Sequence, residues 1–306
     1  MNDVHPGLPQ FDYIKPETLH QASQFLASHI GEARPLLGGT DIFVRMRDGV
    51  WRDRYLVDVK KFDGMQEICY DPVKGLSIGA GVNMNKAIAS FDIQKHYAVL
   101  AEAARSVASY QLRNRATIVG NICNASPAGD TIGACILLGG ELEVHGIGGY
   151  RRYTLAEFFR APGVTALEPG DIVVKLHLPP APKGLVGRYI KLGRNKASDL
   201  SIVGVTAVGY PDDTNVSGFR IKLALASVAP VPLIVEQVEE LLAGVTINQN
   251  VLDESAQIAM QACSPIDDTR ASAQYRKLMV RNLSLKALTE VWNALSGQGV
   301  EGGFYG

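Results

Sequence analysis

A polar stretch between residues 111 and 130 carries the side chains best suited to binding a phosphate-containing ligand. Its segment Thr117–Asn121 combines a hydroxyl, a glycine and an amide. A turn there would direct backbone N–H groups and the hydroxyl at one point, and N–H dipoles bind phosphate without a bulky side chain. From the residues alone, the alternative is a surface loop that caps a buried helix.

The apolar run that follows Pro127 predicts a helix ending near Leu138. Asp130 would lie in the first turn of this helix, where the helix dipole favours a carboxylate. Ser126 directly precedes the proline, so we expect a turn residue rather than a nucleophile. Because the chain has no G-x-S-x-G motif and no clear Cys–His pairing, no catalytic residue is expected in it.

A second glycine-rich loop lies in the segment Pro35–Ile42. Its apolar start predicts a short strand, and the glycines that follow would let a ligand approach the backbone closely. Neither loop matches the dinucleotide-binding pattern G-x-G-x-x-G or the P-loop pattern G-x-x-x-x-G-K-[ST]. Two glycine-rich, hydroxyl-bearing loops together suit a cofactor that contains a diphosphate.

In this order and spacing, the motifs resemble those of the FAD-binding medium subunit of the molybdenum hydroxylases, the xanthine dehydrogenase and carbon monoxide dehydrogenase group. The resemblance extends from about Phe11 to Trp292. One departure is Val119, which stands where the family usually has glycine, and valine adopts a positive φ only at a cost. The matching segments are Leu36–Ile42, Ile78–Val82, Arg113–Asn121, Asn124–Asp130, Tyr189–Arg194 and Asp199–Leu200.

The resemblance implies that both loops hold FAD. Gly38, Gly39 and Thr40 would bind the diphosphate, with Asp41 at the ribityl or diphosphate region. No His or Cys stands where it would suggest a flavin linkage, so non-covalent FAD is expected. The implied cofactor-binding set is Leu36, Leu37, Gly38, Gly39, Thr40, Asp41, Ile42, Val107, Thr117, Gly120, Asn121, Asn124, Asp130, Val173, Lys191 and Leu200.

Three of these positions carry a more specific expectation from the resemblance. Asp130 would accept hydrogen bonds from ribose hydroxyls, a role that suits an ionised carboxylate because it only accepts. Lys191 would lie near the edge of the isoalloxazine and stabilise the anionic reduced flavin. Leu200 would lie against the flavin ring. The alternatives are a helix-start charge at Asp130 and an exposed strand lysine at Lys191.

The cysteines argue against a metal site in this chain. Cys69, Cys123, Cys135 and Cys263 show no C-x-x-C spacing, and no histidine pair has H-x-x-x-H spacing. We therefore expect no metal here, and we expect Cys123 to be a small packing residue. Four cysteines in 306 residues do not form a disulfide framework and suit a reducing cytoplasm.

The composition excludes several classes of protein. Apolar residues make up 46% of the chain, enough for a sizeable core. The net charge of −1 lacks the basic excess of a nucleic-acid-binding protein. No window approaches the ~18 consecutive apolar residues of a membrane span, and the N-terminus lacks the features of a secretory signal. A cytoplasmic protein is expected.

The predicted architecture is α+β. Residues 1–182 would form an FAD-binding domain with lobes at about 1–60 and 61–182, which the resemblance makes two-lobed and similar to the PCMH and vanillyl-alcohol-oxidase fold. The prolines at 179 and 180 mark the boundary. Residues 183–296 would form a C-terminal domain in which helices cover a three-stranded antiparallel sheet, and residues 297–306 a flexible tail.

Several element boundaries follow from periodicity and capping patterns. Capping boxes are predicted at Thr18 and Thr154. An amphipathic helix over residues 271–295 would cover the sheet with Tyr275, Leu278, Asn282, Leu285, Leu288, Trp292 and Leu295. Strands are expected at residues 55–59, 76–82, 172–178, 187–192, 202–210 and 219–229, and further helices at 98–107, 127–138, 231–242 and 252–262.

The resemblance implies a relay function. A molybdopterin-containing large subunit would oxidise the substrate, a small subunit with [2Fe-2S] clusters would pass the electrons on, and FAD in this chain would deliver them to an acceptor such as NAD. One alternative is a stand-alone FAD-dependent oxidase or dehydrogenase with its own substrate site. Another is a nucleotide-binding regulatory module without enzymatic activity.

Overall fold

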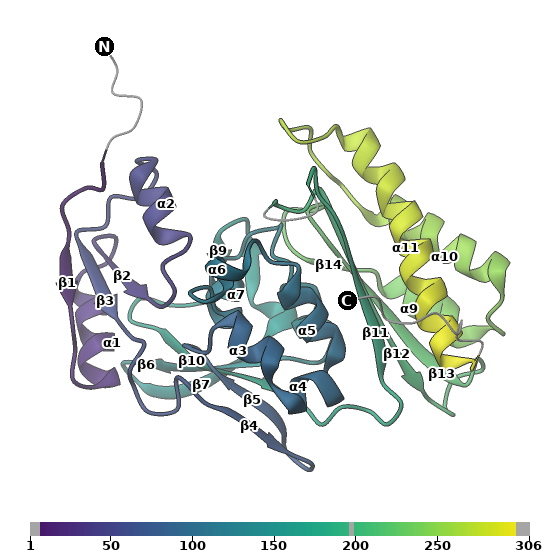
Figure 1. The fold of residues 1–306 in the computed structure, drawn as a ribbon, viewed down its shortest axis with the longest axis horizontal. Coiled ribbons are helices and arrows are strands. Elements are labelled where there is room, and N and C mark those ends of the chain that lie inside the picture. Colours follow the sequence, from purple (N-terminus) through teal and green to yellow (C-terminus); the bar gives the residue numbers. More distant parts are fainter. Residues whose placement is uncertain (1–6, 196–198, 298–306) are drawn as a thin grey trace. The chain divides into compact units, whose positions relative to one another are not determined.

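The computed structural model describes residues 7–195 and 199–297, which form two compact units (Figure 1). The first unit contains the chain up to Ser90 together with residues 108–125 and 139–180. The second contains the chain from Ala181 onward together with residues 91–107 and 126–138. Apart from Gly297, the tail expected to be flexible lies outside the described residues.

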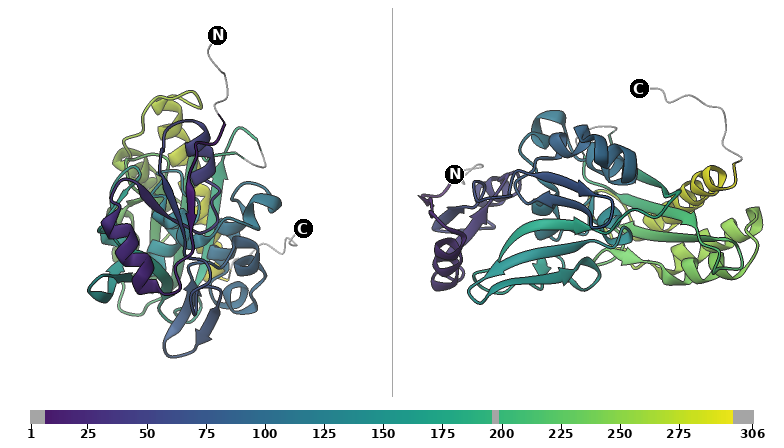
Figure 2. Two further views of the ribbon diagram at one scale, coloured as in Figure 1. Left: turned by 90° about the vertical axis from the view of Figure 1, so that its left-hand side faces the viewer. Right: turned by 90° about the horizontal axis from the view of Figure 1, so that it is seen from below.

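A small parallel sheet begins the first unit, with β3 (Tyr55–Asp58) between β1 (Asp12–Ile14) and β2 (Ala33–Leu36). Helix α1 (Leu19–Ser28) packs beside β2, as Figure 2 shows in purple. Helix α2 (Ile42–Arg47) begins directly after the glycine-rich loop that follows β2. The buried core of this sheet consists of Leu36, Met46 and Leu56.

An antiparallel five-stranded sheet makes up the rest of the first unit, in the order β4-β5-β10-β6-β7. Its central strand β10 is apolar and almost wholly buried, because a middle strand has both edges and both faces covered. The strands are β4 (Ile68–Asp71), β5 (Gly75–Gly79), β6 (Glu141–Gly146), β7 (Gly149–Thr154) and β10 (Ile172–Leu178). The unit also contains α3 (Met84–Ala89), α6 (Tyr110–Arg113), α7 (Ile118–Cys123), the 3-10 turn η1 (Leu155–Glu157) and a hairpin of β8 (Phe159–Ala161) and β9 (Val164–Thr165).

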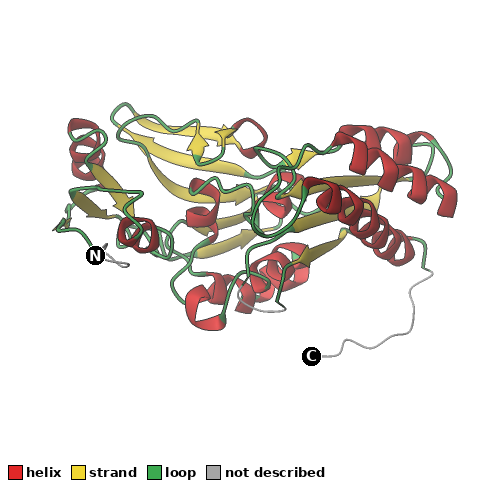
Figure 3. Ribbon diagram, turned by 90° about the horizontal axis from the view of Figure 1, so that it is seen from above, coloured by secondary structure: helices red, strands yellow, loops and turns green. Residues whose placement is uncertain are grey.

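The second unit is built on a four-stranded antiparallel sheet in sequential order, and Figure 3 shows its helices in red and its strands in yellow. The strands are β11 (Val186–Leu192), β12 (Val203–Pro211), β13 (Phe219–Ala226) and β14 (Leu233–Ile234). The helices are α4 (Phe91–His96), α5 (Ala98–Arg105), α8 (Ile132–Leu137), α9 (Glu236–Gly244), α10 (Gln249–Ala262) and α11 (Ala273–Leu295).

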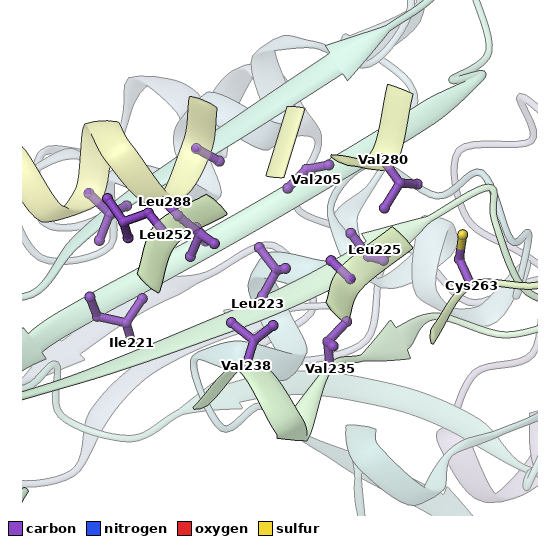
Figure 4. Packing of buried hydrophobic residues seen from close by; sticks show 14 of the residues in the cluster. Val205, Ile221, Leu223, Leu225, Val235, Val238, Leu252, Cys263, Val280 and Leu288 are labelled. Carbon is purple, nitrogen blue, oxygen red and sulfur yellow. The ribbon is translucent and has the colours of Figure 1, made fainter. Parts of the chain in front are cut away.

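Both faces of this sheet are covered, and alternate residues of its strands show how. Val205, Leu223 and Leu225 belong to the apolar cluster that includes α9, α10 and α11 (Figure 4). Thr206 has the opposite orientation and lies against Gly133 of α8. A strand covered on both sides reads as a continuous apolar run, which is why β12 was recognisable in the sequence.

Several predicted elements need correction. The sheet of the second unit has a fourth short strand, β14, beyond the expected three. The helix expected from Pro127 begins only at Ile132, so Asp130 precedes it instead of lying in its first turn. Thr154 does not cap a backbone N–H; its hydroxyl bonds the Glu157 carboxylate, and only a single 3-10 turn follows.

The capping box at the start of α1 is confirmed. Thr18 Oγ1 accepts a 3.1 Å hydrogen bond from the N–H of Gln21. The Gln21 side chain reaches back to the N–H of Glu17, one residue earlier than the usual capping box. The first of these bonds satisfies an N–H group that a helix start leaves without an intrahelical partner, and the second fixes the residue before the N-cap.

The predicted face of helix α11 is confirmed in part, because Leu288 is buried and Leu285, Trp292 and Leu295 pack against the core cluster. The buried positions of the helix include Arg276, Val280 and Leu288, whereas Tyr275 and Leu278 are 44% and 49% exposed. The prediction missed Arg276 and Ser284 because a count of apolar side chains cannot recognise a buried arginine or serine.

Candidate functional site

The loop after β2 packs closely against the segment before α7, because its glycines have no side chain that would keep the two backbones apart. A Cβ at Gly38 would lie only 2.2 Å from the backbone oxygen of Arg115. Gly39 has a φ of +76°, and a Cβ there would lie 2.7 Å from the Phe43 ring. Both positions therefore require glycine, the first for close backbone approach and the second for its left-handed conformation as well.

Asp41 and Asn124 join the two loops of the first unit. Asp41 precedes α2, is exposed, and accepts a 3.1 Å hydrogen bond from the Asn124 Nδ2 group. The Thr40 hydroxyl lies 3.4 Å from the other Asp41 oxygen. Asn124 Oδ1 is buried without a hydrogen-bond partner, which is costly unless a donor is supplied. The loops thus bring together residues that are far apart in sequence.

The segment Thr117–Asn121 is the start of a helix rather than an open turn. Thr117 is the N-cap of α7, and its hydroxyl oxygen accepts a 2.8 Å bond from the N–H of Gly120. A Cβ at Gly120 would lie 2.8 Å from that oxygen, so this glycine protects the cap. The N–H groups of the first helical turn have no intrahelical partners, as the expected phosphate-binding segment requires.

Val119 fits this conformation without strain. It is helical, 1% exposed, and not among the residues with a positive φ. The valine at a position where glycine was expected is therefore accommodated by the helix itself. Its side chain packs into the core together with Ile118 and Ile122, which anchors α7 from within the unit.

Asp130 lies in a buried cluster in the second unit with two residues of β11. Its carboxylate accepts a hydrogen bond from the Tyr189 hydroxyl and a 2.8 Å ion-pair contact from Lys191 Nζ. Lys191 also donates to the backbone oxygen of Ser106, at 3.2 Å. Tyr189 and Lys191 are two residues apart on one strand, so their side chains project from the same face.

The electrostatics of this cluster are those of a buried charge pair. Burial raises the pKa of the Asp130 carboxyl, and Lys191 and Tyr189 offset this only in part. Burial and the neighbouring carboxylate raise the pKa of Tyr189 well above its usual value. A buried carboxylate with two donors retains acceptor capacity, because each oxygen has two lone-pair directions.

The remaining predicted residues are distributed over both units. Ile42 begins α2, and Asn121, half-buried, lies in α7. Val173 is 5% exposed in β10. Leu200, 59% exposed, and Val107, which follows α5, belong to the second unit. Residues 36–42, 117–124 and 173 thus belong to the first unit, and Val107, Asp130, Lys191 and Leu200 to the second.

Two participants were not singled out from the sequence. The Arg115 backbone oxygen sets the approach of the loops, and a backbone atom leaves no signal in side-chain patterns. Tyr189 lies in the matching segment Tyr189–Arg194, but no role was predicted for it. Its spacing of two residues from Lys191 on a strand indicates that both side chains lie on the same face. Across the described part of the chain, no group of three or more His, Cys, Asp or Glu residues could hold a metal ion.

Comparisons with known proteins agree with this architecture. Residues 9–181 match the model of the FAD binding domain in molybdopterin dehydrogenase, and residues 188–291 match the CO dehydrogenase flavoprotein C-terminal domain. The chain is 30% identical over 287 residues to a xanthine dehydrogenase FAD-binding subunit of Escherichia coli O157:H7, covering 94% of this chain and 97% of that protein. It is 28% identical to the carbon monoxide dehydrogenase medium chain of Hydrogenophaga pseudoflava, covering 93% and 98%.

The fold is shared with a solved relative. A chain in the structure of carbon monoxide dehydrogenase from Hydrogenophaga pseudoflava that lacks the Mo-pyranopterin moiety superposes with a TM-score of 0.89 at 28% identity. The alignment covers 94% of this chain and 99% of the other.

These findings define a flavoprotein subunit of the molybdenum hydroxylase class. The chain belongs to the family of FAD-binding medium subunits of xanthine and carbon monoxide dehydrogenases, which are oxidoreductases. The expected family, fold class and FAD cofactor are confirmed. No described helix has the length and apolar character needed to cross a membrane.

Proposed function

We propose that this chain is the electron-relay subunit of a molybdenum hydroxylase and that the loops of its first unit hold the FAD diphosphate. The observation that carries the assignment is the close approach of Gly38 to the Arg115 backbone, where any Cβ would clash and which brings the two glycine-containing loops together. FAD supplies two-electron and one-electron redox chemistry when bound. The chain's own residues bind and orient it.

The polar groups of these two loops suit different parts of the cofactor. Backbone N–H groups at the start of α7 and around Gly39 suit the diphosphate, since they offer partial positive charge. The Asp41 carboxylate would repel a phosphate, so it suits hydroxyl donors of the ribityl chain instead. Asn124 Oδ1, buried and without a partner, is a further acceptor for such a hydroxyl.

In the second unit, we assign Asp130 to the ribose hydroxyls and Lys191 to the reduced flavin. Tyr189 and Lys191 hold the Asp130 carboxylate in one orientation, which prepares it to accept further donors. The ion pair also places a cation in a largely buried environment, where its field is less screened than in water. Leu200, which is exposed, offers an apolar side chain for the ring.

The proposed direction of electron flow rests on the enzymes to which the relatives of the chain belong. The described residues of this chain contain no group of His, Cys, Asp or Glu side chains that could hold a metal ion. Relatives include a carbon monoxide dehydrogenase medium chain and a xanthine dehydrogenase FAD-binding subunit. We therefore infer a large subunit with molybdopterin, a small subunit with [2Fe-2S] clusters and an external acceptor such as NAD.

We expect the FAD to be non-covalent. Burial raises the pKa of the Cys123 thiol to about 12, so this cysteine of α7 is not a thiolate that could attack the flavin. Acid precipitation of the flavin-loaded chain should release all yellow colour into the supernatant. Colour that stays with the pellet would show a covalent link, and a chain that never binds FAD would contradict the proposed function.

A further inference from the structure

Arg276 is a charged side chain at the start of α11 that is buried almost completely, with 2% exposure. Neither the proposed flavin contacts nor the packing of the apolar core explains why an arginine occupies this position. Burying a guanidinium is unfavourable unless its charge is paired and its N–H groups are hydrogen-bonded. Its partners therefore indicate what the residue does.

The guanidinium binds one carboxylate and two backbone carbonyls. Nη2 donates to Asp268 Oδ1 at 2.7 Å, and Nη1 donates to the backbone oxygens of Ile202 at 2.7 Å and Ser227 at 3.0 Å. Burial would raise the pKa of Asp268, but hydrogen bonds from the N–H of Arg270 and from Arg276 lower it below its usual value. Asp268 is thus ionised and forms a true ion pair with Arg276.

The two carbonyls lie at the ends of strands that are linked to other segments by hydrogen bonds. Ile202 directly precedes β12, and Ser227 follows β13 with a left-handed φ of +67°. Ser227 donates its N–H to the backbone oxygen of Pro127 at 2.7 Å and shares a 2.7 Å hydroxyl bond with Ser201. The Ser201 hydroxyl also lies 3.3 Å from the backbone oxygen of Ala128.

A continuous chain of hydrogen bonds therefore runs from Arg276 to the segments adjacent to two proposed flavin contacts, Asp130 and Leu200. Ala128 lies two residues before Asp130, and Ile202 lies two residues after Leu200. All of these residues belong to the second unit. The planar guanidinium suits this task because its donors point in fixed directions, which the ammonium of a lysine cannot reproduce.

We propose that Arg276 is a positioning residue that fixes the segments 127–130 and 199–202, and through them the orientation of Asp130 and Leu200 toward the flavin. The inference rests on the proposed function, because those two residues are assigned to the flavin there. Arg276 itself does not contact the cofactor. Its effect on bound flavin would pass through the backbone of Ile202 and Ser227.

The test compares Arg276→Lys with Arg281→Lys in the 306-residue chain. Arg281 lies on the same helix, is 39% exposed at its side chain and makes only a 3.8 Å contact with Asp253, so it is a matched control. The measurements are the FAD dissociation constant, the visible circular dichroism of the bound flavin and the melting temperature. A residue that only stabilises the fold would change the melting temperature alone.

For Arg276→Lys we expect the FAD dissociation constant to rise about tenfold, as expected when a misplaced Asp130 loses roughly one charge-assisted hydrogen bond to the ribose, together with an altered visible dichroism. Arg281→Lys should match the wild-type chain. A variant with a lower melting temperature but wild-type affinity and dichroism would overturn the proposal.

A second variant covers the case in which Arg276→Lys does not fold. Ser201→Ala removes no charge, but it cuts the hydroxyl link from the Arg276-bound strand ends to Ala128. We expect the same changes of dichroism and affinity, reduced in size, and wild-type flavin properties in this variant would refute the inference. Asp130→Asn separates the two proposals. Unchanged FAD affinity in Asp130→Asn contradicts the flavin assignment itself. If Asp130→Asn binds FAD more weakly but Arg276→Lys binds it as the wild-type chain does, only the positioning role is contradicted.

Discussion

Two adjacent glycines of the first unit, Gly38 and Gly39, are required for different structural reasons. Gly39 is required by its left-handed conformation, whereas Gly38 is required by the backbone of another segment. The close approach at Gly38 brings the loop after β2 against the residues before α7. Substitution of Gly38 therefore tests whether the two loops act as one binding surface.

Gly38→Ala should lower the FAD occupancy of a chain that still folds. The added Cβ would meet the Arg115 oxygen at 2.2 Å, so the loops must separate and their N–H groups diverge. We expect the FAD dissociation constant, measured by fluorescence titration, to rise by about tenfold or more. Gly148→Ala is the control, because a Cβ there meets nothing within 4 Å. Full occupancy in Gly38→Ala would contradict the loop assignment.

The Asp130–Lys191 pair yields a prediction in which two substitutions have opposite signs. Lys191→Met removes the cation, so the reduced flavin loses stabilisation and its midpoint potential should become more negative. Asp130→Asn leaves Lys191 without its counter-charge, so the potential should become more positive. Shifts on the order of tens of millivolts are expected, since 30 mV corresponds to about 1.4 kcal/mol for two electrons. Spectroelectrochemical titration of the bound flavin measures the midpoint potentials of both variants. Unchanged potentials would show that Asp130 and Lys191 do not lie near the flavin.

At the scale of elements, α11 shows how burial and apolar character can diverge. Leu288→Ala should lower the free energy of unfolding by about 2–5 kcal/mol, because Leu288 is fully buried in the core against the sheet. Leu278→Ala, the same change at a half-exposed site, should have a far smaller effect. Chemical denaturation of both variants tests the orientation of the helix. Equal losses of unfolding free energy would show that Leu278 is as buried as Leu288, as the predicted face requires.

The elements that were predictable are those in which local pattern and tertiary environment agree. Strand β10 was predicted with its observed bounds, because five of its seven residues are apolar and two prolines end the run. Helix α7 was missed, since six residues containing a glycine show no helical period. Its stability comes from the Thr117 cap and from buried apolar side chains, and Thr117 was predicted to lie in a turn rather than to cap a helix.

The candidate site was predictable only in part for the same reason. Its loops were identified through glycines and hydroxyls, which mark local backbone geometry. The contacts between distant residues were not, because the bond from Lys191 to Asp130 spans 61 positions and that from Asn124 to Asp41 spans 83. Such pairings depend on the fold. Arg276 was overlooked altogether, since an arginine on an apolar helix is normally assigned to its exposed face.

At the scale of the whole molecule, the chain is similar over nearly its full length to subunits of xanthine and carbon monoxide dehydrogenases. Within residues 7–195 and 199–297, no cluster of metal-ligating side chains is present, and all four cysteines are free thiols. The reaction proposed for the complex needs a molybdenum centre to oxidise the substrate and iron–sulfur clusters to carry electrons. In the proposed function, other subunits supply both.

The purified single chain should therefore bind FAD but oxidise none of the candidate substrates, which include purines, aldehydes and carbon monoxide. It should still reduce a dye with NADH slowly, because hydride transfer to the flavin needs no other subunit. In the native host, it should co-purify with one chain that contains molybdopterin and another that contains iron–sulfur clusters, detectable by metal analysis of the isolated complex. Substrate oxidation by the single chain with FAD alone would overturn the relay function and favour a stand-alone flavoenzyme.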